Sequence, residues 1–201
     1  MKKIFLTFAT LTLSLFVMSQ EVTKQKEVGL VFNNLNNFGL TFKTGTNNSL
    51  WRFNTLFING NNSDEIADSL ENKNKSMGFG IRIGKEYRKI IVKNLEFRYG
   101  ADLSFSYNYS KYDYDDKTVN NSDRLNERTK YTPKINLVFG LNYVFNNNFI
   151  VGAEILPYFS YTTGTITEDY YYNNNKTESD ISEFNYGLSN SSVLVSLAYR
   201  F

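Results

Sequence analysis

The chain contains no cysteine and no histidine, and only two of its 201 residues are proline. Without cysteine there is no disulfide framework and no thiol to which a lipid could be attached. A zinc site would lack both of the ligand types that zinc prefers. Neither a Ser–His nor an Asp–His pair can form for proton transfer at neutral pH. The composition therefore argues against an enzyme, and it predicts no catalytic residue, no cofactor and no metal site.

Charge and hydropathy also lack the extremes that point to common partners. The 22 lysines and arginines are balanced by 20 aspartates and glutamates, so nothing favours a nucleic acid or an acidic partner. No run of about 18 apolar residues follows Met18, which excludes a transmembrane helix in the remainder of the chain. That remainder, about 180 residues, has the length of one domain.

The N-terminus has the three-part layout of a secretory signal peptide. The charged residues Lys2 and Lys3 are followed by an apolar run from position 4 to position 18, and then by Ser19 and Gln20. The apolar run is too short to span a bilayer as a helix. We therefore predict a signal peptide at residues 1–19, with Gln20 as the first mature residue.

Residues 95–109 alternate between apolar and polar side chains without interruption. Phe97, Tyr99 and Leu103 belong to one row, whereas Glu96 and Arg98 belong to the other. Successive side chains of a strand face opposite sides of a sheet, so this segment predicts one aromatic face and one charged or small face. Its length exceeds that of a usual strand of about 5–6 residues, and it suits a tilted strand that crosses a bilayer.

Seven further segments alternate in the same way, and the connections between them differ in length. The connections at residues 45–49, 89–94 and 146–148 are short, whereas those at 60–75, 111–131 and 164–185 are predicted to be long, polar loops. Short turns on one side and long loops on the other are typical of an outer-membrane barrel. Because the connection at residues 33–37 is short as well, we expect the rim to dip there. The expected strands are residues 27–33, 38–44, 50–59, 76–88, 95–109, 132–145, 149–163 and 193–201.

The alternation predicts an all-β fold, an eight-stranded antiparallel up-and-down transmembrane β-barrel at residues 27–201, preceded by a periplasmic N-terminal stub at 20–26. A soluble, lipocalin-like barrel has the same period with its apolar face inside. Eight inward rows of aromatic and aliphatic side chains would overfill so narrow an interior, and aromatic residues gather near the strand ends, as at two membrane interfaces. Pro157 interrupts the seventh strand, where we expect a bulge or a break in pairing.

The signal peptide, the eight strands and the terminal sequence VLVSLAYRF resemble the small outer-membrane β-barrel proteins of Gram-negative bacteria, the OmpA-barrel/OmpX-like group. The abundance of asparagine and tyrosine resembles the Bacteroidota members. The resemblance implies an outer-membrane location and says nothing of an activity. It also implies that the C-terminal row is similar to the signal read by the barrel-assembly machinery; this row is Val193, Val195, Leu197, Tyr199 and Phe201.

Charged residues of both signs occupy the row that would face the interior. Isolated charges in a narrow interior are costly, so these residues should pair or be hydrated. We expect a cross-linked polar core that fixes the strand register and plugs the lumen; the alternative is a narrow, porin-like channel for ions or small solutes, gated by the same pairs. The predicted lumen network is Arg52, Arg82, Glu86, Glu96, Arg98, Asp102, Lys134, Glu154 and Arg200, and Glu27 and Lys43 lie in the same row.

The segment 167–183 combines tyrosine, asparagine and an excess of acidic residues. Tyrosine supplies large, rigid contacts and asparagine supplies adaptable hydrogen bonds, so this segment is a candidate surface for an extracellular ligand. The interpretation that we favour is a solvated segment that faces lipopolysaccharide, and specific ligand capture is the alternative. The expected partners are outer-membrane lipid and lipopolysaccharide, with the barrel itself a monomer. The candidate contact residues are Glu168, Asp169, Tyr170, Tyr171 and Tyr172.

Overall fold

A computed structural model describes residues 24–34, 37–67, 70–116, 124–170, 175–189 and 192–201. Within these ranges the chain forms ten strands, and no helix is long and apolar enough to cross a membrane. The predictions on residues 1–19 and on Gln20 lie outside the described residues. The strands are β1 (Gln25–Asn34), β2 (Asn37–Thr46), β3 (Ser49–Ala67), β4 (Leu70–Val92), β5 (Leu95–Asp116), β6 (Arg124–Phe145), β7 (Phe149–Ile155), β8 (Tyr158–Tyr170), β9 (Asn175–Gly187) and β10 (Val193–Arg200).

Eight of these strands close into an antiparallel ring in the order β5-β4-β3-β2-β1-β10-β7-β6, and the pairing of β5 with β6 completes it. The strands that come first and last in the sequence, β1 and β10, pair along a continuous register from Glu27↔Arg200 to Phe32↔Val195. The ring has no free edge, which is the arrangement that a barrel requires. The prediction of an all-β, eight-stranded antiparallel barrel is confirmed.

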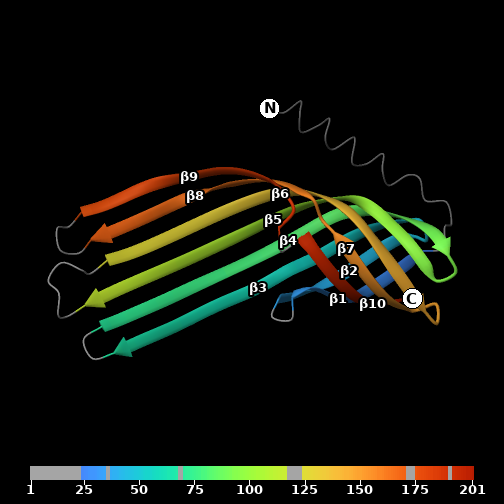
Figure 1. Cartoon of the computed structure of the whole chain (residues 1–201), viewed down its shortest axis with the longest axis horizontal. Helices are drawn as coiled ribbons and strands as arrows, with labels where there is room; N and C mark the ends of the chain where they lie inside the picture. The colour runs from blue at the N-terminus through green and yellow to red at the C-terminus, as the bar shows by residue number, and fades with distance from the viewer. Residues whose placement is uncertain (1–23, 35–36, 68–69, 117–123, 171–174, 190–191) are drawn as a thin grey trace.

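Beyond the rim, β3, β4, β5, β6, β8 and β9 continue as a curved open sheet that stands away from the barrel (Figure 1). We call this part the extension. It contains most of the residues that were predicted to form long loops at 60–75, 111–131 and 164–185, and that prediction is wrong. An exposed aromatic group, Phe159, Tyr161, Phe184 and Tyr186, lies on one face of β8 and β9. Beyond it both faces of the extension are largely polar, so the alternation that marks a lipid-facing strand stops, although the ladder of backbone hydrogen bonds continues.

Two irregularities separate the barrel from the extension. On β3 a bulge between Thr55 and Phe57 accompanies the end of its pairing with β2, and the Thr55 hydroxyl accepts a hydrogen bond from the Leu40 N–H. The second is the break between β7 and β8, which was predicted at Pro157. Here the Pro157 carbonyl accepts from the Leu137 N–H, so β8 still reaches β6. Because β1 and β2 span only 10 residues each, the rim dips there, as predicted.

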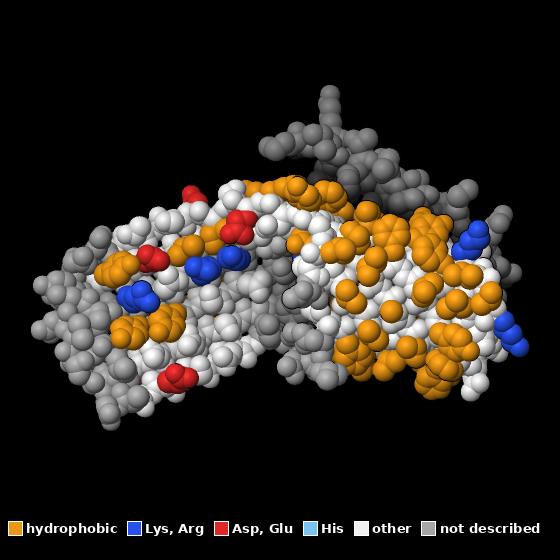
Figure 2. All heavy atoms as spheres, in the orientation of Figure 1, with side chains coloured by type: hydrophobic (Ala, Val, Ile, Leu, Met, Phe, Trp, Pro, Cys, Tyr) orange, Lys and Arg blue, Asp and Glu red, His pale blue; other side chains and the backbone are white. Residues whose placement is uncertain are grey.

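The outer surface of the barrel is apolar, and Figure 2 shows these side chains densely gathered over the barrel end of the molecule and scattered among charged side chains over the extension. Aromatic rings meet near both ends of the band, with Tyr107 and Tyr131 at 5.3 Å and Phe149 and Tyr199 at 5.2 Å between ring centroids. The aromatic belts of membrane proteins lie at such positions. The short turns at the opposite end of the barrel from the extension use asparagines with positive φ, as asparagine tolerates well; these are Asn94, Asn146 and Asn147.

Candidate functional site

The interior of the barrel is filled by charged side chains that are almost fully removed from solvent. Alternation places them there, because every second residue of each ring strand points inward. Arg52 and Arg98 are each 1% exposed and Glu86 is 0% exposed. Burial of an ion is costly unless it is paired and hydrogen-bonded, so the interior depends on its pairing pattern.

At the end with the short turns, two arginines clamp two glutamates. Both terminal nitrogens of Arg88 lie within 2.7 Å of the Glu27 carboxylate. The two terminal nitrogens of Arg200 each lie 2.9 Å from an oxygen of Glu96, in a bidentate arrangement. Arg200 Nε also donates to Glu27 at 2.9 Å. Since Arg200 comes from β10 and Glu27 from β1, this layer links the first and last strands of the sequence.

The middle layer is organised around two carboxylates, Glu86 and Glu154. Glu86 is 2.8 Å from Lys43 Nζ, 3.2 Å from Arg52 Nη1 and 2.7 Å from Arg88 Nη2. Arg52 also holds Glu154 in a bidentate pair at 2.7 and 3.1 Å. Bidentate arginine–carboxylate pairs are among the strongest and most directional hydrogen-bonded contacts in proteins. Because Arg52 lies on β3 and Glu154 on β7, these contacts cross the lumen rather than follow one wall.

Towards the extension the pairing becomes sparse. Asp102 lies 3.4 Å from Arg52 Nε and 3.8 Å from Arg82 Nε, and neither of its oxygens has a hydrogen-bond partner among the described residues. Beside this polar side, Val138, Leu156 and Leu194 form a small buried apolar cluster. Leu156 reaches it because the chain turns at the break before Pro157. The lumen thus changes from dense ion pairs to a half-polar, half-apolar outer end.

Inward glycines make the space that the arginines occupy. A Cβ atom on Gly152 would lie 2.6 Å from Asn142 Oδ1, 2.6 Å from Ser196 Oγ and 3.0 Å from Arg98 Nη2. A Cβ atom on Gly140 would lie 2.8 Å from Arg98 Nε. Such contacts are shorter than real Cβ atoms make, so the absence of a side chain at these positions is part of the network.

Of the nine residues predicted for the lumen network, the structure brings eight into ion-pair contact with one another or with Glu27, Lys43 and Arg88. Lys134 is the exception, since its Nζ lies 4.4 Å from the centre of the Tyr158 ring. Arg88 is a central member that the prediction omitted. It could have been found from its position two residues after Glu86, on the same face of one strand. The inward row also contains Leu50, Val144 and Ile150, which the prediction had not included.

The described candidate surface residues, Glu168, Asp169 and Tyr170, lie at the far end of the extension. Glu168, on β8, accepts a hydrogen bond of 3.0 Å from the Asn126 amide on the neighbouring β6. Asp169 and Tyr170 are paired in register with Lys176 and Asn175, whereas Tyr171 and Tyr172 lie outside the described residues. The described residues contain no cluster of acidic side chains suited to hold a metal ion. On β4, three strands away, the hydrogen bond that the Lys73 ammonium donates to Glu71 raises the pKa of Lys73.

The predicted assembly row lies on the outer face of β10 and just after it. Val193, Val195, Leu197 and Tyr199 alternate with buried or half-buried residues, and each is between 42% and 51% exposed. The Tyr199 and Phe201 rings are stacked with centroids 6.4 Å apart. The row is therefore presented to the surroundings of the barrel, although its use as an assembly signal stays a prediction.

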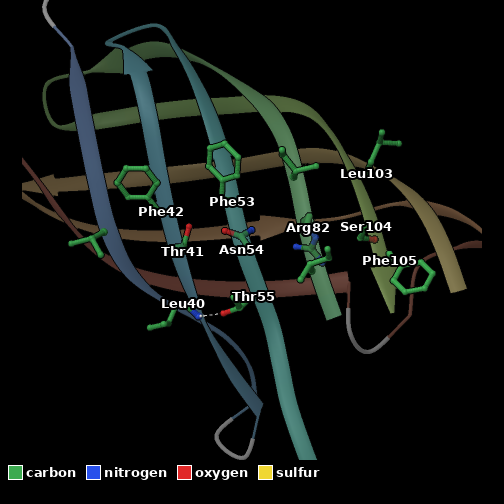
Figure 3. A pocket seen from close by; sticks show the side chains of 13 residues that line it. Leu40, Thr41, Phe42, Phe53, Asn54, Thr55, Arg82, Leu103, Ser104 and Phe105 are labelled. Atoms are coloured by element: carbon green, nitrogen blue, oxygen red, sulfur yellow. Dashed lines mark hydrogen bonds between the residues drawn. The ribbon is translucent and has the colours of Figure 1, made fainter. Parts of the chain in front are cut away.

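The outer wall also contains a hollow of about 620 Å³ over β2, β3, β4 and β5. Figure 3 shows its lining, in which the apolar Leu40, Phe42 and Phe53 of β2 and β3 alternate with the polar Thr41 and Asn54 of the same two strands. Its accessible lining is almost entirely apolar. The hollow therefore belongs to the apolar outer surface, while the polar side chains of the same strands belong to the lumen.

Comparison with known proteins identifies one family and several similar structures. A model described as "Putative OmpA-OmpF-like porin family" matches residues 66–189, more than half of the chain. A crystal structure of a major outer membrane protein from Thermus thermophilus is 13% identical, with 89% of this chain and all of that chain covered and a TM-score of 0.48. Crystal structures of Acinetobacter baumannii CarO and CarO2 are 13% and 12% identical, cover 88% and 89% of this chain and 96% and 97% of theirs, and have TM-scores of 0.37 and 0.34. No curated protein sequence matches the chain.

Proposed function

This chain belongs to the OmpA-OmpF-like porin family, and from that starting point we propose that it is a non-enzymatic outer-membrane barrel with a closed lumen. The observation that carries the proposal is the layer of Arg52, Glu86, Arg98 and Glu154, each at most 3% exposed, in the middle of the barrel. An eight-stranded barrel is only just wide enough to be filled by side chains. Here the filling is cross-linked from wall to wall, so a hydrated ion has no continuous path.

A structural role in the membrane is supported by the same contacts. Arg52 bridges β3 to β7, and Arg200 bridges β10 to β5 through Glu96. These links hold strands that are far apart in the sequence in a fixed register. The two central carboxylates, Glu86 and Glu154, are not free to act as acid and base, because arginines hold both of them. The absence of histidine from the sequence supports the same non-enzymatic role.

The cellular location and the orientation of the barrel are also part of the proposal. Residues 1–19 would direct export, and the outward row ending in Tyr199 and Phe201 would be read by the barrel-assembly machinery in a Gram-negative outer membrane. The apolar band would contact outer-membrane lipid, and the barrel would act as a monomer. The extension would stand outside the cell, where residues 168–172 would meet lipopolysaccharide or an extracellular ligand.

Single-channel recording in a planar lipid bilayer tests the closed lumen. We expect the purified, folded protein to give a flat current trace, indistinguishable from that of detergent alone, because the middle layer leaves no aqueous path. Regular, voltage-independent current steps from the unaltered protein would contradict the proposal. They would establish the alternative, a narrow channel for ions or small solutes.

A further inference from the structure

We infer that the outer end of the lumen is a binding site for the phosphate or carboxylate group of an anion, built around Arg82 and Lys134. The inference does not depend on whether ions cross the barrel. A cavity of about 100 Å³ lies between the middle layer and the extension. At about 30 Å³ per water this is the space of about three water molecules, which suits one small anionic group. Its polar lining includes Arg82, Ser104, Lys134, Asn136, Tyr158 and Ser192.

Arg82 is a buried cation without adequate partners. Its side chain is 6% exposed, and its Nε and Nη1 atoms have no hydrogen-bond partner among the described residues. Its one ion contact within the described chain is Asp102 at 3.8 Å, and Asp102 lies closer to Arg52, at 3.4 Å. A buried guanidinium with free donors is strongly unfavourable, and an oxyanion would supply the acceptors that it lacks. Arginine also matches the geometry of phosphate and carboxylate groups.

The charges of the lumen leave a positive excess at this end. Among the described residues, seven cations line the interior against five carboxylates. Each of the five carboxylates lies closer to one of the other five cations than to Arg82 or Lys134, so the positive excess falls on these two residues. The cations are Lys43, Arg52, Arg82, Arg88, Arg98, Lys134 and Arg200, and the carboxylates are Glu27, Glu86, Glu96, Asp102 and Glu154.

Lys134 faces the same cavity and has no carboxylate among the described residues within ion-pair distance. Its Nζ is held over the Tyr158 ring at 4.4 Å, which orients the ammonium without neutralising it. Next to it the Asn136 amide donates to the Ser104 hydroxyl at 3.1 Å, which leaves that hydroxyl proton free to be donated elsewhere. Two cations and a hydroxyl donor thus converge on one cavity, as an oxyanion site requires.

A row of basic residues leads to this cavity along β6. Arg124, Arg128, Lys130 and Lys134 are separated by even numbers of residues on one uninterrupted strand, so they share the concave face of the extension with the lumen. They span about 33 Å at about 3.3 Å per residue. Two carboxylates of the neighbouring β8 and β9 share this face: Glu183 lies 3.9 Å from Lys130 Nζ, and Glu168 stands opposite Asn126, so four cations of β6 face two carboxylates. Such a row attracts anions and guides them inward.

Isothermal titration of the full chain in detergent micelles free of lipopolysaccharide tests the site, with inorganic phosphate at constant ionic strength as the probe. We expect saturable binding of one phosphate per chain, weakened at least tenfold by Arg82→Gln and by Lys134→Gln. The matched control is Lys111→Gln, which removes one positive charge from the opposite face of the extension, where Lys111 lies near Glu127. This variant should bind phosphate as the unaltered protein does. Heat-dependent gel mobility confirms that each variant is folded.

The source of the anion is separated by competition. If the natural occupant is a soluble anion, phosphate should bind in micelles and purified lipopolysaccharide should not displace it. If the occupant is a phosphorylated lipid headgroup, lipopolysaccharide should displace phosphate from the unaltered protein, and lipopolysaccharide titrated directly should bind Arg82→Gln at least tenfold more weakly. The absence of saturable phosphate binding, or an equal loss of binding in Lys111→Gln, would overturn the inference.

Discussion

Replacing Glu86 by alanine is expected to cost the folded barrel about 3–5 kcal/mol, the loss typical of removing one partner from a buried ion network. Glu86 lies within 4 Å of four cations, namely Lys43, Arg52, Arg88 and Arg98. The alanine variant leaves these charges buried together without the carboxylate at their centre. Urea unfolding in detergent micelles, followed by the fluorescence of the single tryptophan, Trp51, measures the effect.

Two variants make the result specific. Glu86→Gln preserves the shape of the side chain and removes only its charge, so its midpoint should fall between those of the unaltered protein and Glu86→Ala. Glu168→Ala removes a carboxylate from the extension, where hydrogen bonds from Asn126 at 3.0 Å and from the exposed Tyr170 at 3.5 Å are lost, and should cost about 1 kcal/mol. If Glu86→Ala unfolds at the same urea concentration as Glu168→Ala, the network does not stabilise the barrel.

Removing two arginines from the middle layer is expected to turn a silent barrel into a conducting one. Arg52 and Arg98 are the largest fully buried side chains, and both contact Glu154. In the double variant Arg52→Ser/Arg98→Ser the freed volume fills with water. Glu154 loses both of its arginine partners, whereas Glu86 keeps Lys43 and Arg88, so an unpaired Glu154 carboxylate lines the opening and the current should favour cations. Planar bilayer recording in asymmetric salt gives both the conductance and the sign of the selectivity.

A double variant on the extension provides the control. Arg128→Ser/Lys130→Ser removes the same total charge from the concave face beyond the rim, and its trace should stay as flat as that of the unaltered protein. A folded Arg52→Ser/Arg98→Ser protein that also gives a flat trace would show that these side chains do not close the lumen. Anion selectivity would contradict the assignment of the remaining carboxylates to the opening.

The barrel was predictable from the sequence because its outer face is apolar and its inner face is polar, which gives each strand a strict alternation. Residues 95–109 alternate strictly, and this parity predicts that Arg98 and Asp102 point inward; each is 1% exposed in the structure. The extension was missed because its strands lack a continuous apolar row, so a largely polar strand such as β9 resembles a loop in the sequence. Pairing between neighbours, rather than burial, makes these segments strands.

The partners within the lumen could not be predicted, because parity gives the face of a strand but not the depth of a residue or its neighbour across the barrel. Arg52 and Glu154 are 102 positions apart in the chain and form the bidentate pair of the middle layer. Lys134 has the same parity as the network but lies beyond the last carboxylate, where it meets Tyr158. The register of all eight strands must be known before an inward cation that meets a carboxylate, such as Arg52, can be distinguished from one that does not, such as Lys134.

Thiol labelling tests most directly that the lumen is open at its outer end and closed at the ion-pair layers. The chain has no cysteine, so a single introduced cysteine is the only reactive thiol. Ser106 lines the outer cavity, and Ser196 is 5% exposed beside Gly152 in the closed part. With a membrane-impermeant maleimide added to protein in lipid vesicles, we expect Ser106→Cys to be labelled and Ser196→Cys to react only after unfolding. Equal labelling rates for the two folded variants would contradict the account.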